Sequence, residues 1–229
     1  MAGSARCQYS EQRHTRVNLV KRIGIFGTSG FAREVGDIAR DNGFVPIYIA
    51  YDKTELLRWN FDDEVVCEDD LSLFSAIPLA IGIGDRVVRE RLERNFRTHQ
   101  FPNLVHSTAT FGYRQRDGID KARGVIISAG ARLTNNIAVG NFAVFDRNSM
   151  VGHDSIIGNF AHLAPGACVS GNVHVGAGSW IGAAAVINQG NGHIKLSIGA
   201  GTVIGSGAVV IASCEANAVY AGVPAKRIR

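Results

Sequence analysis

Two histidines in the middle of the chain, His153 and His162, have side chains suited to acid–base chemistry. An imidazole changes its charge near neutral pH, so it can take a proton from a reacting group. The carboxylate of Asp154, which directly follows His153, or that of another acidic neighbour could fix the imidazole tautomer and stabilise the imidazolium. Both histidines are therefore candidates for acid–base chemistry. Four other histidines are interpreted as surface or local hydrogen-bonding residues: His99, His106, His174 and His193.

A glycine-rich turn near the start of the chain could hold a phosphate. The apolar run 22–26 leads into Gly27, Thr28, Ser29 and Gly30, and a helical pattern follows. A helix N-terminus after such a turn attracts phosphate, so Gly27, Ser29 and Gly30 are candidates for binding a diphosphate. The glycine spacing is GxxGxxG and not GxGxxG, so the redox dinucleotide fingerprint is absent. The alternative is that these glycines only permit a tight strand-to-helix turn.

A six-residue repeat occupies the second half of the chain. From Ile127 to Ile187 an apolar residue recurs at every sixth position without a change of register. A second, mostly small residue follows each of them four positions later, so every unit has one bulky and one small inward side chain. Neither the period of an α-helix nor that of a strand keeps this pattern on one face. The repeat predicts a three-sided parallel β-helix.

The register of this repeat places both histidines on the outside of the coil. His153 lies two positions after the inward Val151, and His162 lies five after the inward Ile157. We expect both to face solvent or a neighbouring subunit, and neither to be a core residue. Glycine often follows the bulky residue directly, and there we expect the chain to turn with positive φ. The spacing breaks over 188–197, which we predict to be a loop or an irregular corner.

The residues before the repeat alternate between strand and helix patterns. Apolar runs at 22–26, 45–50 and 78–83 predict strands, and helical patterns follow the first and the third. This alternation predicts a small parallel sheet. Asp52 and Lys53 lie just beyond the carboxyl end of the second run, where ligands of such sheets bind, and Asp52 is a candidate for binding a ribose or sugar hydroxyl.

The predicted fold class is α/β plus β. We expect a flexible extension over residues 1–20, a Rossmann-like domain over 21–105 and a left-handed β-helix over 106–229, with a polar insertion at 114–124. A chain of 229 residues with 46% hydrophobic residues can bury such a core without disulfides or metals.

Composition also narrows the class of protein. A net charge of +4, spread along the chain, favours small anions and argues against nucleic acid as a partner. The sequence lacks a long apolar run and the apolar core of a signal peptide, so we expect no membrane insertion and a cytoplasmic location. The cysteines are far apart and fit reduced thiols: Cys7, Cys67, Cys168 and Cys214.

Several ordered segments resemble one family. They read GTSGFAREV, IGIGDRVVRE, NLVHSTA, VGHDSIIGNFAHLAPGACVSGNVHVG and AGVPAKRI, and they cover nearly the whole chain from Arg22. This set resembles bacterial sugar acyltransferases of the PglD/NeuD type, which include nucleotide-4-aminosugar N-acetyltransferases. The resemblance implies acetyl transfer from acetyl-coenzyme A to an amine on a nucleotide-linked sugar, with 4-amino-4,6-dideoxy sugars as the expected acceptors, in bacterial glycan biosynthesis. It also implies a homotrimer with active sites between adjacent β-helices, and no metal.

The resemblance assigns roles to particular positions of this chain. It implies that His153 is the general base and that Asp154 is its acidic partner. It implies that the coenzyme contacts His162, Gly182, Ala183, Gly205 and Ser206. It implies that the sugar nucleotide contacts Ser29, Gly30, Phe31, Asp52, Lys53 and Gly84. Lys226 and Arg227 are candidate contacts for coenzyme phosphates, with a solvated basic tail as the alternative.

One departure from the family pattern concerns the acceptor. Phe31 stands where many members have a histidine, and a phenyl ring cannot hydrogen-bond a phosphate or a sugar hydroxyl. A second departure follows the second apolar run. Many members have a pair of acidic residues there, whereas this chain has Tyr51, Asp52 and Lys53, and this difference could change which sugar or base is recognised.

Three alternatives remain open at this stage. The same site could acetylate a sugar hydroxyl instead of an amine. A zinc enzyme of the γ-carbonic-anhydrase type shares the β-helix and would use His153, His162 and His174, but the HxxxxH pair of that family is missing. A binding or scaffold protein with an inactive site would not need His153.

Overall fold

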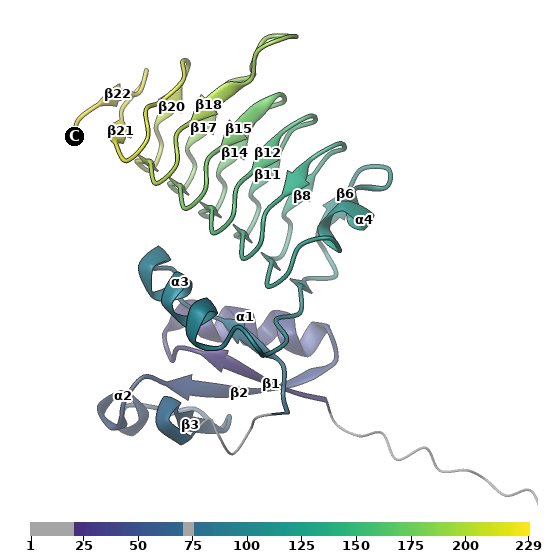
Figure 1. Ribbon diagram of the computed structural model, residues 1–229, viewed down its shortest axis with the longest axis vertical. Coiled ribbons are helices and arrows are strands. Elements are labelled where there is room, and N and C mark those ends of the chain that lie inside the picture. Colours follow the sequence, from purple (N-terminus) through teal and green to yellow (C-terminus); the bar gives the residue numbers. More distant parts are fainter. Residues whose placement is uncertain (1–20, 71–75) are drawn as a thin grey trace, which may run out of the picture.

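The computed structural model describes residues 21–70 and 76–229. The extension predicted over residues 1–20 lies outside the described residues. The described chain folds into an N-terminal α/β part and a long coil of short strands that leads to the C-terminus (Figure 1). Among the described helices, none combines the length and the apolar character that a membrane span requires.

The N-terminal part is built on a four-stranded parallel sheet with the strand order β3-β2-β1-β4. Its strands are β1 (Lys21–Phe26), β2 (Phe44–Ala50), β3 (Val65–Cys67) and β4 (Leu79–Ile81). Its helices are α1 (Gly30–Asp41), α2 (Lys53–Leu57) and α3 (Arg86–Asn95). The three predicted strands and the two predicted helices are confirmed. The hydrophobic pattern does not reveal β3 and α2, because they span only 3 and 5 residues.

Helix α1 begins at the glycine turn, and its C-terminal end is hydrogen-bonded to the β-helix. Its buried face includes Ala32, Val35, Ile38 and Ala39. Asn42 ends the helix, and its side-chain amide donates to the carbonyl oxygens of Ile38 at 2.8 Å and Val105 at 2.9 Å. Because Val105 belongs to the first strand of the coil, this one side chain links the helix end to the β-helix.

The second part is a left-handed parallel β-helix with three sheets. The eight-stranded sheet has the order β22-β21-β19-β16-β13-β10-β7-β5, the six-stranded sheet β20-β17-β14-β11-β8-β6, and the four-stranded sheet β18-β15-β12-β9. All neighbours are parallel except β21 and β22. The strands are β5 (Leu104–Val105), β6 (Thr110–Phe111), β7 (Ile126–Ile127), β8 (Arg132–Leu133), β9 (Ala138–Val139), β10 (Val144–Phe145), β11 (Met150–Val151), β12 (Ile156–Ile157), β13 (His162–Leu163), β14 (Cys168–Val169), β15 (Val173–Val175), β16 (Trp180–Ile181), β17 (Val186–Ile187), β18 (Leu196–Ile198), β19 (Val203–Ile204), β20 (Val209–Val210), β21 (Val219–Ala221) and β22 (Lys226–Arg227).

The core of the β-helix follows the predicted two inward positions of each unit. Bulky residues such as Leu133, Phe145 and Ile181 are buried, and so are small ones such as Ala143 and Ala161. Each fully buried aliphatic side chain contributes roughly 1.5–3 kcal/mol relative to exposure. The repeat therefore stabilises the coil along its whole length.

The expected role of the glycines that follow the bulky residues is wrong. Positive φ falls at the third position after the bulky residue, for example at Asn136, Asp154 and Gly166, where φ is 55°, 60° and 69°. The glycines directly after the bulky residues are needed because adjacent coils approach closely. A Cβ at Gly140 or Gly152 would lie 2.4 Å from a backbone nitrogen of the next coil.

Two irregular segments interrupt the coil. The predicted break after β17 is confirmed, since no strand forms between Ile187 and Leu196. The insertion at 114–124 contains a short helix, α4 (Gln115–Ile119). The side chain of Gln115 is buried and exchanges two hydrogen bonds with the backbone of Ile137, donating and accepting at 2.8 Å. The amide thereby replaces a strand partner just before edge strand β9 and protects the sheet edge.

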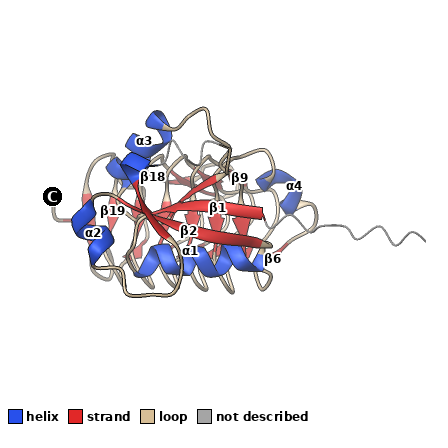
Figure 2. Ribbon diagram, turned by 90° about the horizontal axis from the view of Figure 1, so that it is seen from below, coloured by secondary structure: helices blue, strands red, loops and turns tan. Residues whose placement is uncertain are grey.

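The N-terminal part packs against one face of the β-helix. Figure 2 shows the sheet of the N-terminal part, with β1 and β2, lying across the coils of the β-helix. Helix α1 packs on outward residues of β5, β7 and β10. Arg89 of α3 is buried and donates to the backbone carbonyls of Phe142 and Phe160. Burial lowers the pKa of Arg89 to about 10. We call this contact region the seam.

Candidate active site

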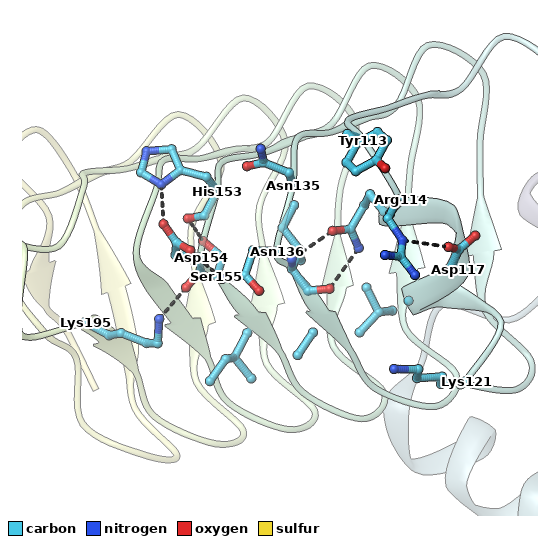
Figure 3. Close-up of a pocket in the computed structure, with 16 residues that line it drawn as sticks. Tyr113, Arg114, Asp117, Lys121, Asn135, Asn136, His153, Asp154, Ser155 and Lys195 are labelled. Carbon is cyan, nitrogen blue, oxygen red and sulfur yellow. Dashed lines mark hydrogen bonds and ion pairs between the residues drawn. The ribbon is translucent and has the colours of Figure 1, made fainter.

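A cleft of about 1020 Å³ lies along one edge of the β-helix (Figure 3). It follows the corner of the coil where the six-stranded sheet meets the four-stranded sheet of the β-helix, and the segment around α4 lines one end. We call it the His153 cleft. Its polar side chains include Tyr113, Arg114, Lys121, Asn135, Asn136, His153, Asp154 and Lys195.

His153 and Asp154 form a hydrogen-bonded pair in this cleft, as predicted from their adjacency. Nδ1 of His153 lies 2.7 Å from Oδ2 of Asp154, so the imidazole N–H donates to the carboxylate. The other carboxylate oxygen accepts from the amide of Asn136 at 2.5 Å. The bonds from Asn136 and His153 lower the pKa of Asp154. Nε2 of His153 has no hydrogen-bond partner among the described residues, and the side chain is 51% exposed.

The next coil leaves room for this imidazole. A Cβ at Gly171 would lie 2.6 Å from Nε2 of His153, so only glycine permits the observed ring position without a shift. Lys195 reaches the same corner from the irregular segment after β17. Its ammonium donates to the backbone carbonyl of Asp154 and, at 3.0 Å, to Oδ1 of Asn172. The break in the repeat therefore positions a cation beside Asp154.

The residues that the resemblance assigns to the coenzyme lie at a different corner. Gly182 and Ala183 follow β16, and Gly205 and Ser206 follow β19, where the eight-stranded sheet meets the six-stranded one. His153 follows β11, at the next corner of the coil. One chain therefore does not bring these four residues together with His153.

His162 points out of the coil as predicted, but the expectation that it faces solvent or a neighbouring subunit is wrong. It starts β13 and lies under the N-terminal part, with its ring 5.6 Å from that of Phe31 and 4.3 Å from that of Trp180. Neither ring nitrogen has a hydrogen-bond partner among the described residues, and Oδ2 of Asp146, at 3.9 Å from Nε2, is too far away to accept one. Burial lowers the pKa of His162 and outweighs Asp146. The repeat gives the outward direction but not the domain that covers it.

His162 lines a second cavity, of about 600 Å³, at the seam. The cavity lies between the start of α3 and the outer face of the β-helix. Gly84, which the resemblance assigns to the sugar nucleotide, lines it together with Arg86, Arg89 and Trp180. The predicted acceptor residue Gly84 and the predicted coenzyme residue His162 thus share one cavity, separate from the His153 cleft.

A third cavity, of about 380 Å³, lies where the strands of the N-terminal sheet end. We call it the strand-end pocket. Ser29, Tyr51 and Ile83 line it just beyond β1, β2 and β4, and Glu68 lines it directly after β3. The pocket lies at the end of the sheet where ligands of parallel sheets generally bind. Of the residues predicted to contact the sugar nucleotide or its diphosphate, Gly27 and Ser29 line this pocket.

The other predicted acceptor residues have different surroundings. Gly30 begins α1, and Phe31 turns toward His162 at the seam. The carboxylate of Asp52 accepts from the backbone N–H of Glu55 at 2.8 Å and caps α2, which begins at Lys53. Of these four, none lines the strand-end pocket.

Sequence reasoning missed three charged residues of this pocket. Glu55 accepts hydrogen bonds from the Thr28 hydroxyl and, at 2.6 Å, from the backbone N–H of Tyr51. Glu68 lies 3.8 Å from the guanidinium of Arg91, and burial raises the pKa of Glu68 despite that neighbour. The only sequence signal for Glu68 is its place directly after the apolar triplet of β3.

The three histidines of the metal alternative do not meet. His153 lies in its cleft, His162 at the seam, and His174 is exposed on β15. Within residues 21–70 and 76–229, no group of three or more His, Cys, Asp or Glu side chains is arranged to hold a metal ion. The structure therefore gives no support to a zinc site made by one chain.

Comparison with known proteins gives one sequence match and several structural matches. No protein-family profile matches the chain. Over 78 residues the chain is 40% identical to the GDP-perosamine N-acetyltransferase of Escherichia coli O157:H7. That match covers 34% of this chain and spans 35% of the length of the relative.

Two solved structures match almost the whole chain. WeeI from Acinetobacter baumannii AYE is 28% identical, with a TM-score of 0.78, over 91% of this chain and 100% of that one. A mutant of the GDP-perosamine N-acetyltransferase from Caulobacter crescentus, in complex with CoA and GDP-perosamine, is 25% identical, with a TM-score of 0.80, over 92% of this chain and 98% of that one. These matches confirm the resemblance to hexapeptide-repeat sugar acyltransferases that the sequence motifs predict.

Proposed function

We propose that this hexapeptide-repeat sugar acyltransferase moves the acetyl group of acetyl-coenzyme A to an amine on a nucleotide-linked sugar. The two N-acetyltransferases that it resembles, one of them solved with CoA and GDP-perosamine, support an amine over a hydroxyl as the acceptor. The observation that carries the proposal is the His153–Asp154 pair, whose Nδ1–Oδ2 distance is 2.7 Å.

In this proposal His153 acts as the general base. Its Nδ1–H is held by Asp154, so Nε2 is the atom that accepts a proton. The amine nitrogen attacks the thioester carbonyl, His153 takes one proton from that nitrogen, and the C–S bond breaks to release the thiolate of coenzyme A. Asp154 then stabilises the imidazolium, and its lowered pKa keeps it ionised for this role.

We further propose that the active site forms between two copies of the chain. His153 and the coenzyme residues Gly182, Ala183, Gly205 and Ser206 lie at different corners of the coil, so neighbouring copies in a trimer would bring them together. Outward side chains of the six-stranded and four-stranded sheets of the coil support such packing, since Met150 and Ile156 are large, apolar and exposed. Light scattering coupled to size-exclusion chromatography tests for the trimer.

The N-terminal part would hold the sugar nucleotide. The strand-end pocket has Thr28 and Ser29 at the start of α1, a position suited to a diphosphate. His162 and Gly84 share the seam cavity, and their contacts with coenzyme and sugar nucleotide remain predictions. Lys226 and Arg227 are exposed on β22 and remain candidates for coenzyme phosphates.

A calorimetric titration of the full chain with acetyl-coenzyme A tests the proposal first. We expect saturable binding at one site per chain. A panel of nucleotide-linked amino and hydroxy sugars, followed by release of free coenzyme A, then tests the acceptor. Absence of coenzyme binding at millimolar concentration contradicts the acyltransferase, whereas acetylation of hydroxy sugars alone contradicts the amine acceptor.

A further inference from the structure

The strand-end pocket carries a pair of opposite charges, Glu68 and Arg91. Glu68 follows β3 at the edge of the sheet, and Arg91 projects from α3. Oε2 of Glu68 is 3.8 Å from Nη2 of Arg91, and the Glu68 and Arg91 side chains are 21% and 37% exposed. These two side chains thus present an acceptor and a donor next to each other inside the pocket.

The rest of the pocket suits a flat aromatic ring. Phe26, Ile49, Ile83 and Val88 supply apolar walls. Tyr51 is a further aromatic side chain of the lining, and the guanidinium of Arg91 lies 5.1 Å from the centre of its ring. The volume of about 380 Å³ is within the range of small-molecule pockets.

Glu55 does not compete with Glu68 for a ligand. One of its oxygens accepts from the hydroxyl of Thr28 and the other from the backbone N–H of Tyr51. Its carboxylate therefore joins the ends of β1 and β2. Among the carboxylates that line this pocket, Glu68 is the one whose oxygens accept no hydrogen bond from another described residue.

The pattern of donors on a base decides which base fits this pair. Guanine has two adjacent N–H donors, at N1 and N2, beside the acceptor O6. A carboxylate accepts from both donors, and a guanidinium donates to O6. Uracil and thymine have a single N–H between two carbonyl oxygens, so one of those oxygens would face the carboxylate. Adenine and cytosine have an acceptor next to their amino group.

We propose that Glu68 and Arg91 recognise a guanine base, so that the acceptor is a GDP-linked sugar. This inference rests on the proposed function, since it places the nucleotide of the acceptor in the strand-end pocket. The base would lie at the Glu68 end, and the diphosphate would extend toward Thr28 and Ser29 at the start of α1.

Calorimetric titration of the full chain with GDP, IDP, UDP and dTDP tests this proposal. We expect GDP to bind at least about 10-fold more tightly than UDP or dTDP, because each pyrimidine leaves Glu68 facing a carbonyl oxygen. IDP lacks the 2-amino group and should bind more weakly than GDP. This comparison uses the unmodified protein, so it does not depend on a variant that folds.

The variant Glu68→Gln removes one acceptor and the charge. We expect it to weaken GDP at least about 10-fold and to narrow the gap between GDP and UDP. Asp69→Asn is the matched control, because Asp69 is the adjacent acid, is exposed and does not line the pocket. It should bind GDP like the unmodified chain, and thermal unfolding monitored by circular dichroism should show that both variants fold.

The outcomes separate this inference from the proposed function. Equal binding of GDP and UDP, or equal effects of Glu68→Gln and Asp69→Asn, would overturn guanine recognition. Acetyl-coenzyme A binding without binding of any nucleotide would also overturn it and leave the acyltransferase standing. If the chain binds GDP more tightly than UDP but does not bind acetyl-coenzyme A, the proposed function is contradicted and the role of Glu68 is supported.

Discussion

The His153 cleft and the seam hold the same side chain in opposite surroundings. The imidazole of His153 is half exposed and has a carboxylate partner at 2.7 Å. The imidazole of His162 is 5% exposed, lies beside Phe31 and Trp180, and has its nearest carboxylate oxygen at 3.9 Å. Both project outward from the same coil, so the repeat alone does not distinguish them.

This difference shows what makes a histidine able to exchange protons. Asp154 holds one ring nitrogen of His153, which leaves the other free in an open cleft. Burial of His162 disfavours its charged form, and no described residue accepts a hydrogen bond from its ring. We therefore expect the first histidine to govern turnover and the second to govern how stability depends on pH.

The largest expected effect is that of removing His153. We expect His153→Ala to lower kcat by about 10²–10⁴, the usual contribution of a positioned general base, with the fold unchanged. Steady-state release of coenzyme A measures the change. His174→Ala is the control, because His174 is exposed on β15 and outside the cleft. If His153→Ala turned over as fast as His174→Ala, His153 would not be the general base, and its contrast with His162 would have no bearing on turnover.

A smaller effect is expected from moving the same ring without removing it. Gly171→Ala places a methyl group 2.6 Å from Nε2 of His153, and the three atoms nearest to that methyl all belong to the imidazole. The ring must therefore shift while the backbone stays, and we expect kcat to fall by about 10–10².

The control for this substitution is another glycine of the same region. Gly192→Ala adds a methyl group that meets nothing within 4 Å, so its turnover should match that of the unmodified chain. If the two alanine variants have equal turnover, the position of the His153 ring does not limit the reaction.

The β-helix could be predicted in more detail than the sites. A period of six fixes which residues face inward, and the pair His153–Asp154 forms between neighbours in the sequence. The positive φ of Asp154 and the close coil contact at Gly171 arise from stacking, which a period does not reveal. The sequence therefore predicts the corner of the coil where His153 lies, but not the backbone conformation and the contact with the next coil that position its ring.

The N-terminal pocket was harder to predict because its residues meet only in the folded sheet. Tyr51, Glu68 and Arg91 come from three separate segments, and Glu68 follows a strand of 3 residues. Asp52, chosen for its place just beyond the second apolar run, caps a helix that the hydrophobic pattern does not show. Strand order decides which segments share a sheet edge, and no short motif in this chain encodes it.

The smallest expected effect concerns stability at the seam. Burial lowers the pKa of His162 below its usual 6.5, so the unfolded chain binds the proton more readily than the folded chain. As pH falls from 6.5 to the lowered pKa, the unfolded state gains protons and the free energy of unfolding decreases. The slope is at most about 1.4 kcal/mol per pH unit for one group.

The substitution His162→Phe should remove this slope, since a phenyl ring keeps the contacts with Phe31 and Trp180 but does not titrate. Urea unfolding at pH 7.5, 6.5 and 5.5, values that we choose to bracket the window, measures the difference between variant and unmodified chain. Carboxylates that titrate in both proteins cancel in that difference. His174→Gln should keep the full slope because His174 is exposed. If His162→Phe and the unmodified chain have equal slopes, His162 is not the group that makes stability depend on pH.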